Sequence, residues 1–174
     1  MQAFLNHFVF GVYPYIAITV MVLGSIIRYE RDPFTWKTSS SQLLRRRQFV
    51  IGSVLFHVGV LLILAGHLVG LLTPLAIWDA LGVPHGAKQI FAMVMGGVAG
   101  VMALVGGIIL LHRRLMDPRV RANSTLADTG ILILLMAQLV LGLGSIFVSM
   151  GHLDGHEMVK LMQWAQGVVY FGPD

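Results

Sequence analysis

The sequence predicts an all-α integral membrane protein with four transmembrane helices and a C-terminal amphipathic helix on the membrane surface. Two observations carry this prediction. Of the 174 residues, 56% are hydrophobic and only 11% are charged, whereas a soluble domain carries about 25% charged residues. The apolar residues also lie in four long blocks, each able to cross a hydrocarbon core that takes about 20 residues of helix.

Polar or basic residues bound each block and so set the approximate limits of the spans. No linker, repeat or change of composition divides the chain, so residues 1–174 are interpreted as one domain. The first basic residue is Arg28, so the first block lacks the positive region that opens a signal peptide, and we expect it to remain as a helix. The four expected spans are Phe4–Ile27, Phe49–Leu72, Ile90–Leu111 and Ala127–Met150.

The positions of the basic residues predict the orientation. Ten of the twelve Lys and Arg residues lie in two connecting segments, residues 28–47 and 112–125, while Lys88 and Lys160 lie on the opposite side. The positive-inside rule therefore places both segments in the cytoplasm and the N-terminus outside. Tryptophans are expected as interfacial anchors on the two sides of the membrane. These are Trp36 on the inner side, and Trp78 and Trp164 on the outer side.

The segment after the fourth span differs from the spans. Asp154 and Glu157 have the spacing of a variant capping box, which predicts that a helix begins there. Apolar residues then recur at helical spacing, as expected of an amphipathic helix that lies on the outer membrane surface. They are Met158, Leu161, Met162, Ala165, Val168 and Val169.

The second span contains two histidines, His57 and His67, which are ten residues apart. Ten residues of helix rise about 15 Å, so His57 lies near the middle or in the inner half of the membrane and His67 lies near its outer end. Ionisable residues inside a span are costly and usually face a cavity, a partner or a cofactor. Two imidazoles at two depths suit two haem groups. Hydrogen bonding across helix interfaces is the competing interpretation, and the residues alone leave both open.

The remaining residue types narrow the possible chemistry. The chain has no cysteine, which excludes a thiolate-bound zinc ion, an iron–sulfur cluster or a disulfide within it. No charged residue lies deep in any span, which disfavours a transporter. The other histidines lie near interfaces or in loops and are interpreted as ordinary surface residues. They are His7, His85, His112, His152 and His156.

Glycines accompany the second-span histidines. Gly52, Gly59 and Gly66 are seven residues apart and so lie on nearly one face of the helix, and Gly66 and Gly70 flank His67. Such residues allow the close approach of another helix or of a flat macrocycle. Helix packing alone is the commoner explanation.

Three cations at the ends of the third span are further candidates. Lys88 opens this span on the same side as His67, where it either donates to a quinone carbonyl or simply extends to the interface. Arg113 and Arg114 lie at the inner membrane edge. Besides fixing topology, they are candidates for pairing with haem propionates, anionic lipid or an acidic partner subunit.

Six segments of the chain resemble the gamma subunit of respiratory nitrate reductase, the membrane cytochrome b subunit of that enzyme. Several of them lie in polar loops, where general membrane composition does not produce a match. They are YPYIA at 13–17, the RY…TW…SSQ pattern from Arg28 to Gln42, LFHVG at 55–59, GHLVGLLTP at 66–74, GGIILLHRRLMDPRVRA at 106–122 and DGHEMVKLMQWAQGVV at 154–169.

The resemblance implies a quinol-oxidising haem b subunit, the quinol dehydrogenase part of a nitrate reductase in a prokaryotic cytoplasmic (inner) membrane. His57 matches an axial ligand of the inner haem and His67 one of the outer haem, while Lys88 and Gly66 match the site that oxidises menaquinol or ubiquinol. Electrons would pass to an iron–sulfur beta subunit and then to a molybdenum alpha subunit that reduces nitrate. The chain would also anchor this complex in membrane lipid, and no nucleic-acid partner is expected.

The chain departs from the family in one respect. The family has a fifth transmembrane helix that supplies the second axial histidine of each haem, and the sequence stops where the loop into that helix would begin. A shortened chain, a fifth helix on another polypeptide and an omitted segment are all consistent with this. The alternative functions are a related quinone-reactive haem b subunit of another redox complex and a haem-free membrane anchor.

Overall fold

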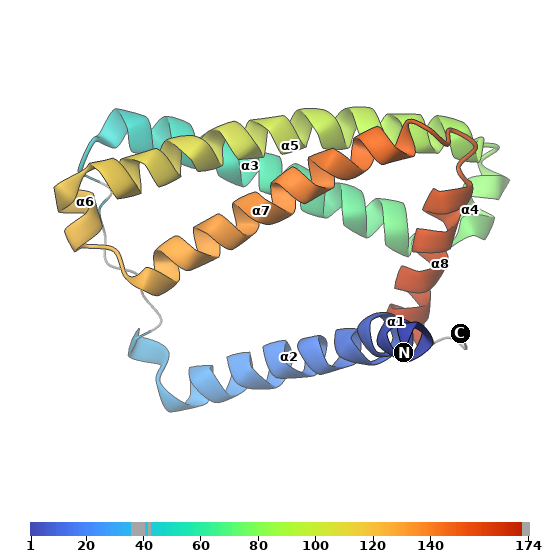
Figure 1. Cartoon of the computed structure of the whole chain (residues 1–174), viewed down its shortest axis with the longest axis horizontal. Helices are drawn as coiled ribbons and strands as arrows, with labels where there is room; N and C mark the ends of the chain where they lie inside the picture. The colour runs from blue at the N-terminus through green and yellow to red at the C-terminus, as the bar shows by residue number, and fades with distance from the viewer. Residues whose placement is uncertain (36–40, 42, 172–174) are drawn as a thin grey trace. The chain divides into compact units, whose positions relative to one another are not determined.

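The computed structural model describes residues 1–35, 41 and 43–171. Its regular elements in these ranges are all helical, and four helices are long and apolar enough to cross a membrane, which confirms the predicted fold class. Figure 1 shows the helices in chain order. The chain forms two compact units, one made of Met1–Thr38 and Trp164–Asp174 and the other of Ser39–Gln163. Trp36, an expected anchor, lies outside the described residues.

In the first unit, the first span is continuous from Gln2 to Arg31 but changes its winding. Helix α1 (Gln2–His7) passes into a π-helical turn, η1 (Phe8–Val12), and then into α2 (Tyr13–Arg31), which is followed by the short 3-10 helix η2 (Pro33–Thr35). The change of winding falls just before a proline, Pro14, in the first turn of α2.

Pro14 has no N–H, so the carbonyl of Phe10, four residues earlier, cannot receive the usual α-helical hydrogen bond. The indole Nε1–H of Trp164 donates to this carbonyl oxygen at 2.9 Å, and the rings of Phe10 and Trp164 meet edge to face at 6.1 Å. An unpaired backbone group in lipid costs several kcal/mol, so this bond supports the first span. Trp164, which the sequence suggests only as an interfacial anchor, therefore has a specific backbone partner.

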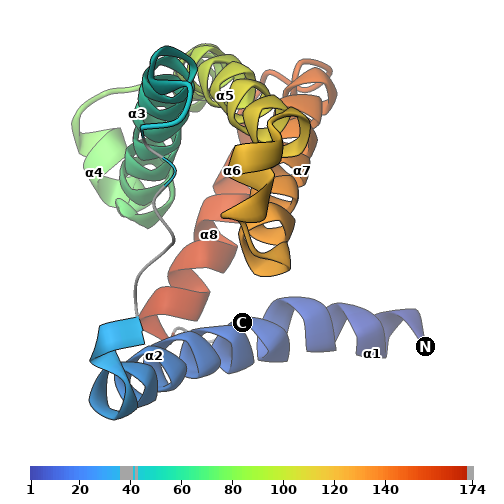
Figure 2. The same cartoon turned by 90° about the vertical axis from the view of Figure 1, so that its left-hand side faces the viewer.

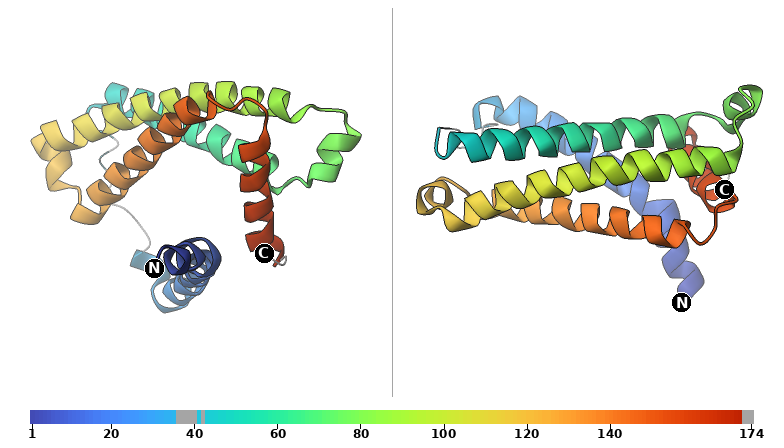
Figure 3. Two further views of the ribbon diagram at one scale, coloured as in Figure 1. Left: turned by 45° about the vertical axis from the view of Figure 1, so that its right-hand side comes forward. Right: turned by 90° about the horizontal axis from the view of Figure 1, so that it is seen from above.

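In the second unit, three long helices follow one another in antiparallel order. Helix α5 lies between α3 and α7, as the end-on and top views show (Figure 2, Figure 3). The observed limits agree with the predicted spans to within a few residues at each end, whereas the two short helices in the turns were not predicted. The helices are α3 (Arg46–Leu72), α4 (Leu75–Ala80), α5 (His85–Met116), α6 (Pro118–Ala122) and α7 (Leu126–Ser149).

Small residues bring α3 and α5 into close contact. A Cβ on Gly59 would lie 2.7 Å from the backbone nitrogen of Ala103, and a Cβ on Gly106 would overlap the backbone nitrogen of Phe56. Without water to drive apolar association, such close backbone approach is a main source of helix packing in lipid. The predicted glycine stripe on α3 is only partly used, because a Cβ on Gly66 would meet no atom within 4 Å.

Helix α8 (His156–Tyr170) forms where the sequence predicts an amphipathic helix. Met162 and Ala165 are buried, while Leu161 and Val169 of the predicted apolar face are 50% and 45% exposed.

The start of α8 differs from the predicted capping box. Asp154 accepts a hydrogen bond from the backbone N–H of His156, but Glu157 forms an ion pair with Lys160 at 2.8 Å. Gly155 between them has a left-handed backbone (φ 82°), and a Cβ there would also lie 2.7 Å from the Cβ of His85, so the position favours glycine for both reasons.

Candidate haem and quinol site

The two histidines of α3 are held in the same way. Nδ1 of His57 lies 2.7 Å from the carbonyl oxygen of Ser53, and Nδ1 of His67 lies 2.8 Å from that of Ile63. A carbonyl oxygen only accepts, so each Nδ1 carries a proton, and Nε2 is the ring nitrogen left for a metal. Metal-bound histidines show this pattern, in which the second ring nitrogen donates to a backbone carbonyl and so fixes the tautomer and the ring orientation.

Both imidazoles are exposed in the second unit, so each Nε2 is available to a ligand. The described residues contain no group of three His, Cys, Asp or Glu side chains that could hold a bare metal ion. A metal bound here would therefore need a further set of ligands, which a porphyrin supplies. Imidazoles at two depths of one helix have the donor chemistry that haem iron requires.

The helix surface beside His67 is open. A Cβ built on Gly66 or on Gly70 meets no atom within 4 Å, so neither glycine is required by helix packing in the described part of the chain. By contrast, Gly59 on the same helix is needed for contact with α5. The open surface next to the outer histidine leaves space for a flat ring.

Lys88 is buried (7% exposed), and its ammonium contacts protein groups. Its Nζ donates to the carbonyl oxygen of Gly70 at 3.2 Å and to the sulfur of Met162 at 3.0 Å, and it lies 4.2 Å from the ring centre of Trp78. Gly70 belongs to the last turn of α3, whose carbonyls have no helical partner, so Lys88 also caps this helix. No carboxylate pairs with it among the described residues.

Lys88 belongs to a polar corner at the start of α5. Gln89 is 4% exposed and donates to the carbonyls of Ser149 and His152, which closes the end of α7. His85, expected to be an ordinary surface residue, is half-buried, and its Nε2 lies 3.4 Å from Asp79. Hydrophobic periodicity gives no signal for these contacts, because the partners come from other segments of the chain.

Three buried side-chain polar atoms lack a hydrogen-bond partner among the described residues, and all three lie in this polar corner. They are Nε1 of Trp78, Nδ1 of His85 and Oε1 of Gln89.

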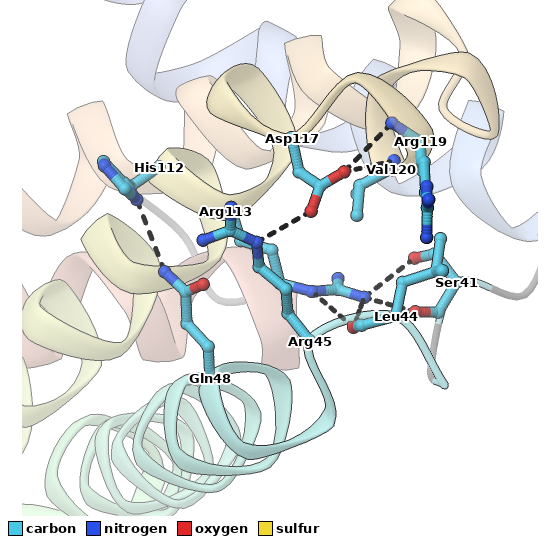
Figure 4. Close-up of polar contacts among 9 residues, drawn as sticks. All are labelled: Ser41, Leu44, Arg45, Gln48, His112, Arg113, Asp117, Arg119 and Val120. Carbon is cyan, nitrogen blue, oxygen red and sulfur yellow. Dashed lines mark hydrogen bonds and ion pairs between the residues drawn. The ribbon is translucent and has the colours of Figure 1, made fainter.

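At the opposite end of α5, Arg113 is 5% exposed and is held by backbone carbonyls (Figure 4). Its guanidinium donates to the carbonyl oxygens of Leu44 and Ser41 and lies 4.9 Å from the ring of Phe49. Arg114 is half-buried and lines a hollow at the start of α7. The propionate role expected of this pair stays a prediction, and the contacts of Arg113 show a second role in holding the loop before α3.

Asp117 follows this arginine pair and closes α5. It accepts hydrogen bonds from the backbone N–H groups of Arg119 and Val120 and forms an ion pair with Arg45 at 2.7 Å. Burial alone would raise the pKa of Asp117, but the backbone N–H of Arg119, the Arg45 guanidinium and the N–H of Val120 together hold it below the ordinary value. The carboxylate is therefore the charged partner that joins the two basic segments.

The fold defines a multi-pass, all-α integral membrane protein whose second span presents two imidazoles at different depths. The chain belongs to the nitrate reductase gamma subunit family, whose model matches residues 6–174. This confirms the resemblance seen in its motifs.

Curated relatives agree with the family assignment. The chain is 50% identical to the respiratory nitrate reductase 1 gamma chain of Escherichia coli (strain K12), over 97% of this chain and 74% of that protein. It is also 50% identical to the respiratory nitrate reductase 2 gamma chain of the same organism, over 98% and 75%. The nitrate reductase gamma chain of Bacillus subtilis (strain 168) is 34% identical, over 94% and 74%. The chain is thus a membrane subunit of an oxidoreductase complex with other subunits.

Proposed function

We propose that this chain is the quinol-oxidising haem b subunit of a respiratory nitrate reductase, in which His57 and His67 each supply one axial ligand. The observation that carries the proposal is the fixed tautomer of both imidazoles, with Nδ1–H donated to a carbonyl of the same helix. A histidine that only packs across a helix interface would use Nε2 to bond the neighbouring helix. No described residue bonds Nε2 of either histidine, which favours an external ligand.

The haem and the protein residues would have separate roles in the site. Haem, when bound, supplies reversible one-electron chemistry at iron, and the protein fixes the ligand orientation through the Ser53 and Ile63 carbonyls. The two imidazoles are separated by about 15 Å along the helix, which spreads the redox groups over the depth of the membrane. Electrons would leave through an iron–sulfur beta subunit to a molybdenum alpha subunit.

Lys88 is the candidate quinol-binding cation. A buried ammonium that lacks a carboxylate partner stabilises an electronegative oxygen placed against it, because low polarity strengthens the attraction. Menaquinol and ubiquinol both carry such oxygens. Gly66 leaves the neighbouring surface of α3 open, so that a quinol ring can approach the helix next to His67.

The test is the reduced-minus-oxidised absorption spectrum of the intact complex in membranes. The wild type should show b-type haem, and His57→Ala and His67→Ala should each weaken this signal. His152→Ala, which changes an exposed histidine outside the spans, should keep it. A complex that reduces nitrate with an artificial electron donor but shows no haem absorption would contradict the proposal and leave a haem-free membrane anchor.

A further inference from the structure

The indole N–H of Trp78 is buried and has no partner among the described residues. Tryptophans that anchor a protein at a membrane interface direct this N–H to water or to lipid headgroups. The anchoring role expected from the sequence therefore does not explain why the N–H of Trp78 is buried. A buried donor without an acceptor lowers stability. An acceptor from outside the described residues would remove this cost.

The location of this N–H narrows the choice of acceptor. The Nζ atom of Lys88 lies 4.2 Å from the centre of the Trp78 ring. One of its two hydrogen bonds is to the sulfur of Met162, which is a weak acceptor. Two neighbouring side chains therefore offer donors: the indole N–H, which is unpaired, and the ammonium, which gives one of its two hydrogen bonds to a poor acceptor. Both would be satisfied by oxygen atoms.

We propose that Trp78 is a second hydrogen-bond donor of the quinol site, with Nε1–H bonded to an oxygen of the quinol headgroup beside Lys88. This inference rests on the proposed function. Quinol hydroxyl and quinone carbonyl oxygens both accept hydrogen bonds, so this contact holds the ring before and after oxidation. An indole N–H only donates and carries no proton away, so Trp78 acts in binding and positioning.

The experiment compares wild-type and Trp78→Phe holo-complex, since phenylalanine keeps an aromatic ring beside Lys88 and removes the donor. The probe is an alkyl-hydroxyquinoline N-oxide, a quinol analogue. Its dissociation constant should rise about three- to tenfold, which is the loss expected for one hydrogen bond. The KM for quinol should rise with little change in kcat, and the haem spectrum should stay as in the wild type. Thermal stability should be unchanged or higher, because an unpaired donor has been removed.

Trp164→Phe is the matched control, because it makes the same substitution at an indole whose N–H is already paired with Phe10. It should lower stability and leave the dissociation constant of the analogue unchanged. An unchanged dissociation constant and KM in Trp78→Phe, with the haem spectrum intact, would overturn the inference. So would a loss of stability without a change in affinity, since it would show that a water or a protein group pairs this N–H.

A second measurement covers the case in which Trp78→Phe does not assemble. Wild-type complex containing nitrogen-15-labelled tryptophan is compared by infrared difference spectroscopy with and without the analogue. The inference requires an indole N–H band that shifts when the analogue binds, and the absence of any such shift overturns it. Failure of the proposed function would be seen separately, as a wild-type complex without b-type haem.

Discussion

Arg45 and Asp117 form an ion pair, with Nε of the arginine 2.7 Å from Oδ2 of the aspartate (Figure 4). The residues are 72 positions apart and stand at the N-cap positions of α3 and α6, respectively. Arg45 has a left-handed backbone (φ 44°), which is unusual for a residue with a side chain. The ion pair and the carbonyl contacts of Arg113 therefore hold the loop before α3 against the end of α5.

We predict that Asp117→Asn lowers the thermal midpoint of unfolding at neutral pH, because asparagine can still cap α6 but cannot form the ion pair. The pKa of Asp117 in the folded protein lies below its ordinary value of about 4. The stabilisation is therefore complete above pH values of about 4 and is lost as the pH falls through the lowered pKa.

Thermal unfolding of the purified protein at neutral and acidic pH measures this effect. The difference between the wild type and Asp117→Asn should shrink on acidification. Asp154→Asn, which changes an exposed aspartate at the opposite end of the unit, is the control for the general effect of losing a carboxylate. A difference that is independent of pH would contradict the role of the ion pair.

We predict that Gly59→Ala destabilises the contact between α3 and α5. The added methyl group would lie 2.7 Å from the backbone nitrogen of Ala103. A backbone atom cannot rotate away as a side chain can, so the two helices would have to separate. Overpacking of this kind costs about 1–3 kcal/mol. The control is Gly96→Ala on α5, where the new Cβ meets no atom within 4 Å.

The control should be neutral or should gain roughly 0.5–1 kcal/mol, because alanine is the better helix former. The measurement is equilibrium unfolding in mixed detergent micelles. Equal effects of the two substitutions would show that the close backbone approach does not support the fold.

The limits of the spans could be predicted from sequence, because lipid requires helices of a certain length and excludes unpaired charges from their centres. The same reasoning placed His57 and His67 at two depths. It could not show their Nδ1–H bonds to carbonyls of the same helix, because these depend on side-chain rotation.

The tertiary partners of individual residues were beyond the reach of the sequence patterns. Lys88 and Trp78 were expected near the outer interface, and the structure brings them together through α4, a short helix that no periodicity indicated. Arg113 was recognised as a cation at the membrane edge, but its acceptors are backbone carbonyls of the loop before α3. Backbone carbonyls are present at every residue, so a sequence gives no sign of which one is used.

We predict that Trp164→Phe lowers the free energy of unfolding by about 1–3 kcal/mol, the cost of leaving a backbone carbonyl of the first span without a donor in lipid. The carbonyl of Phe10 cannot receive the α-helical hydrogen bond from the residue four positions on, because that residue is Pro14 and has no N–H. Pro14→Ala restores an N–H at that position, so Trp164→Phe should cost less in the Pro14→Ala background. The double-mutant cycle measures this coupling, and strictly additive effects would contradict it.

We predict that residues 112–125 face the cytoplasm and that the start of α8 faces the outside, as the distribution of the basic residues requires. The chain contains no cysteine, so one introduced thiol reports a single position. Asn123→Cys and Lys160→Cys both change exposed residues. In intact cells a membrane-impermeant maleimide should label Lys160→Cys, whereas Asn123→Cys should be labelled only after the cells are opened. The wild-type chain should remain unlabelled throughout, and labelling of Asn123→Cys in intact cells would reverse the predicted orientation.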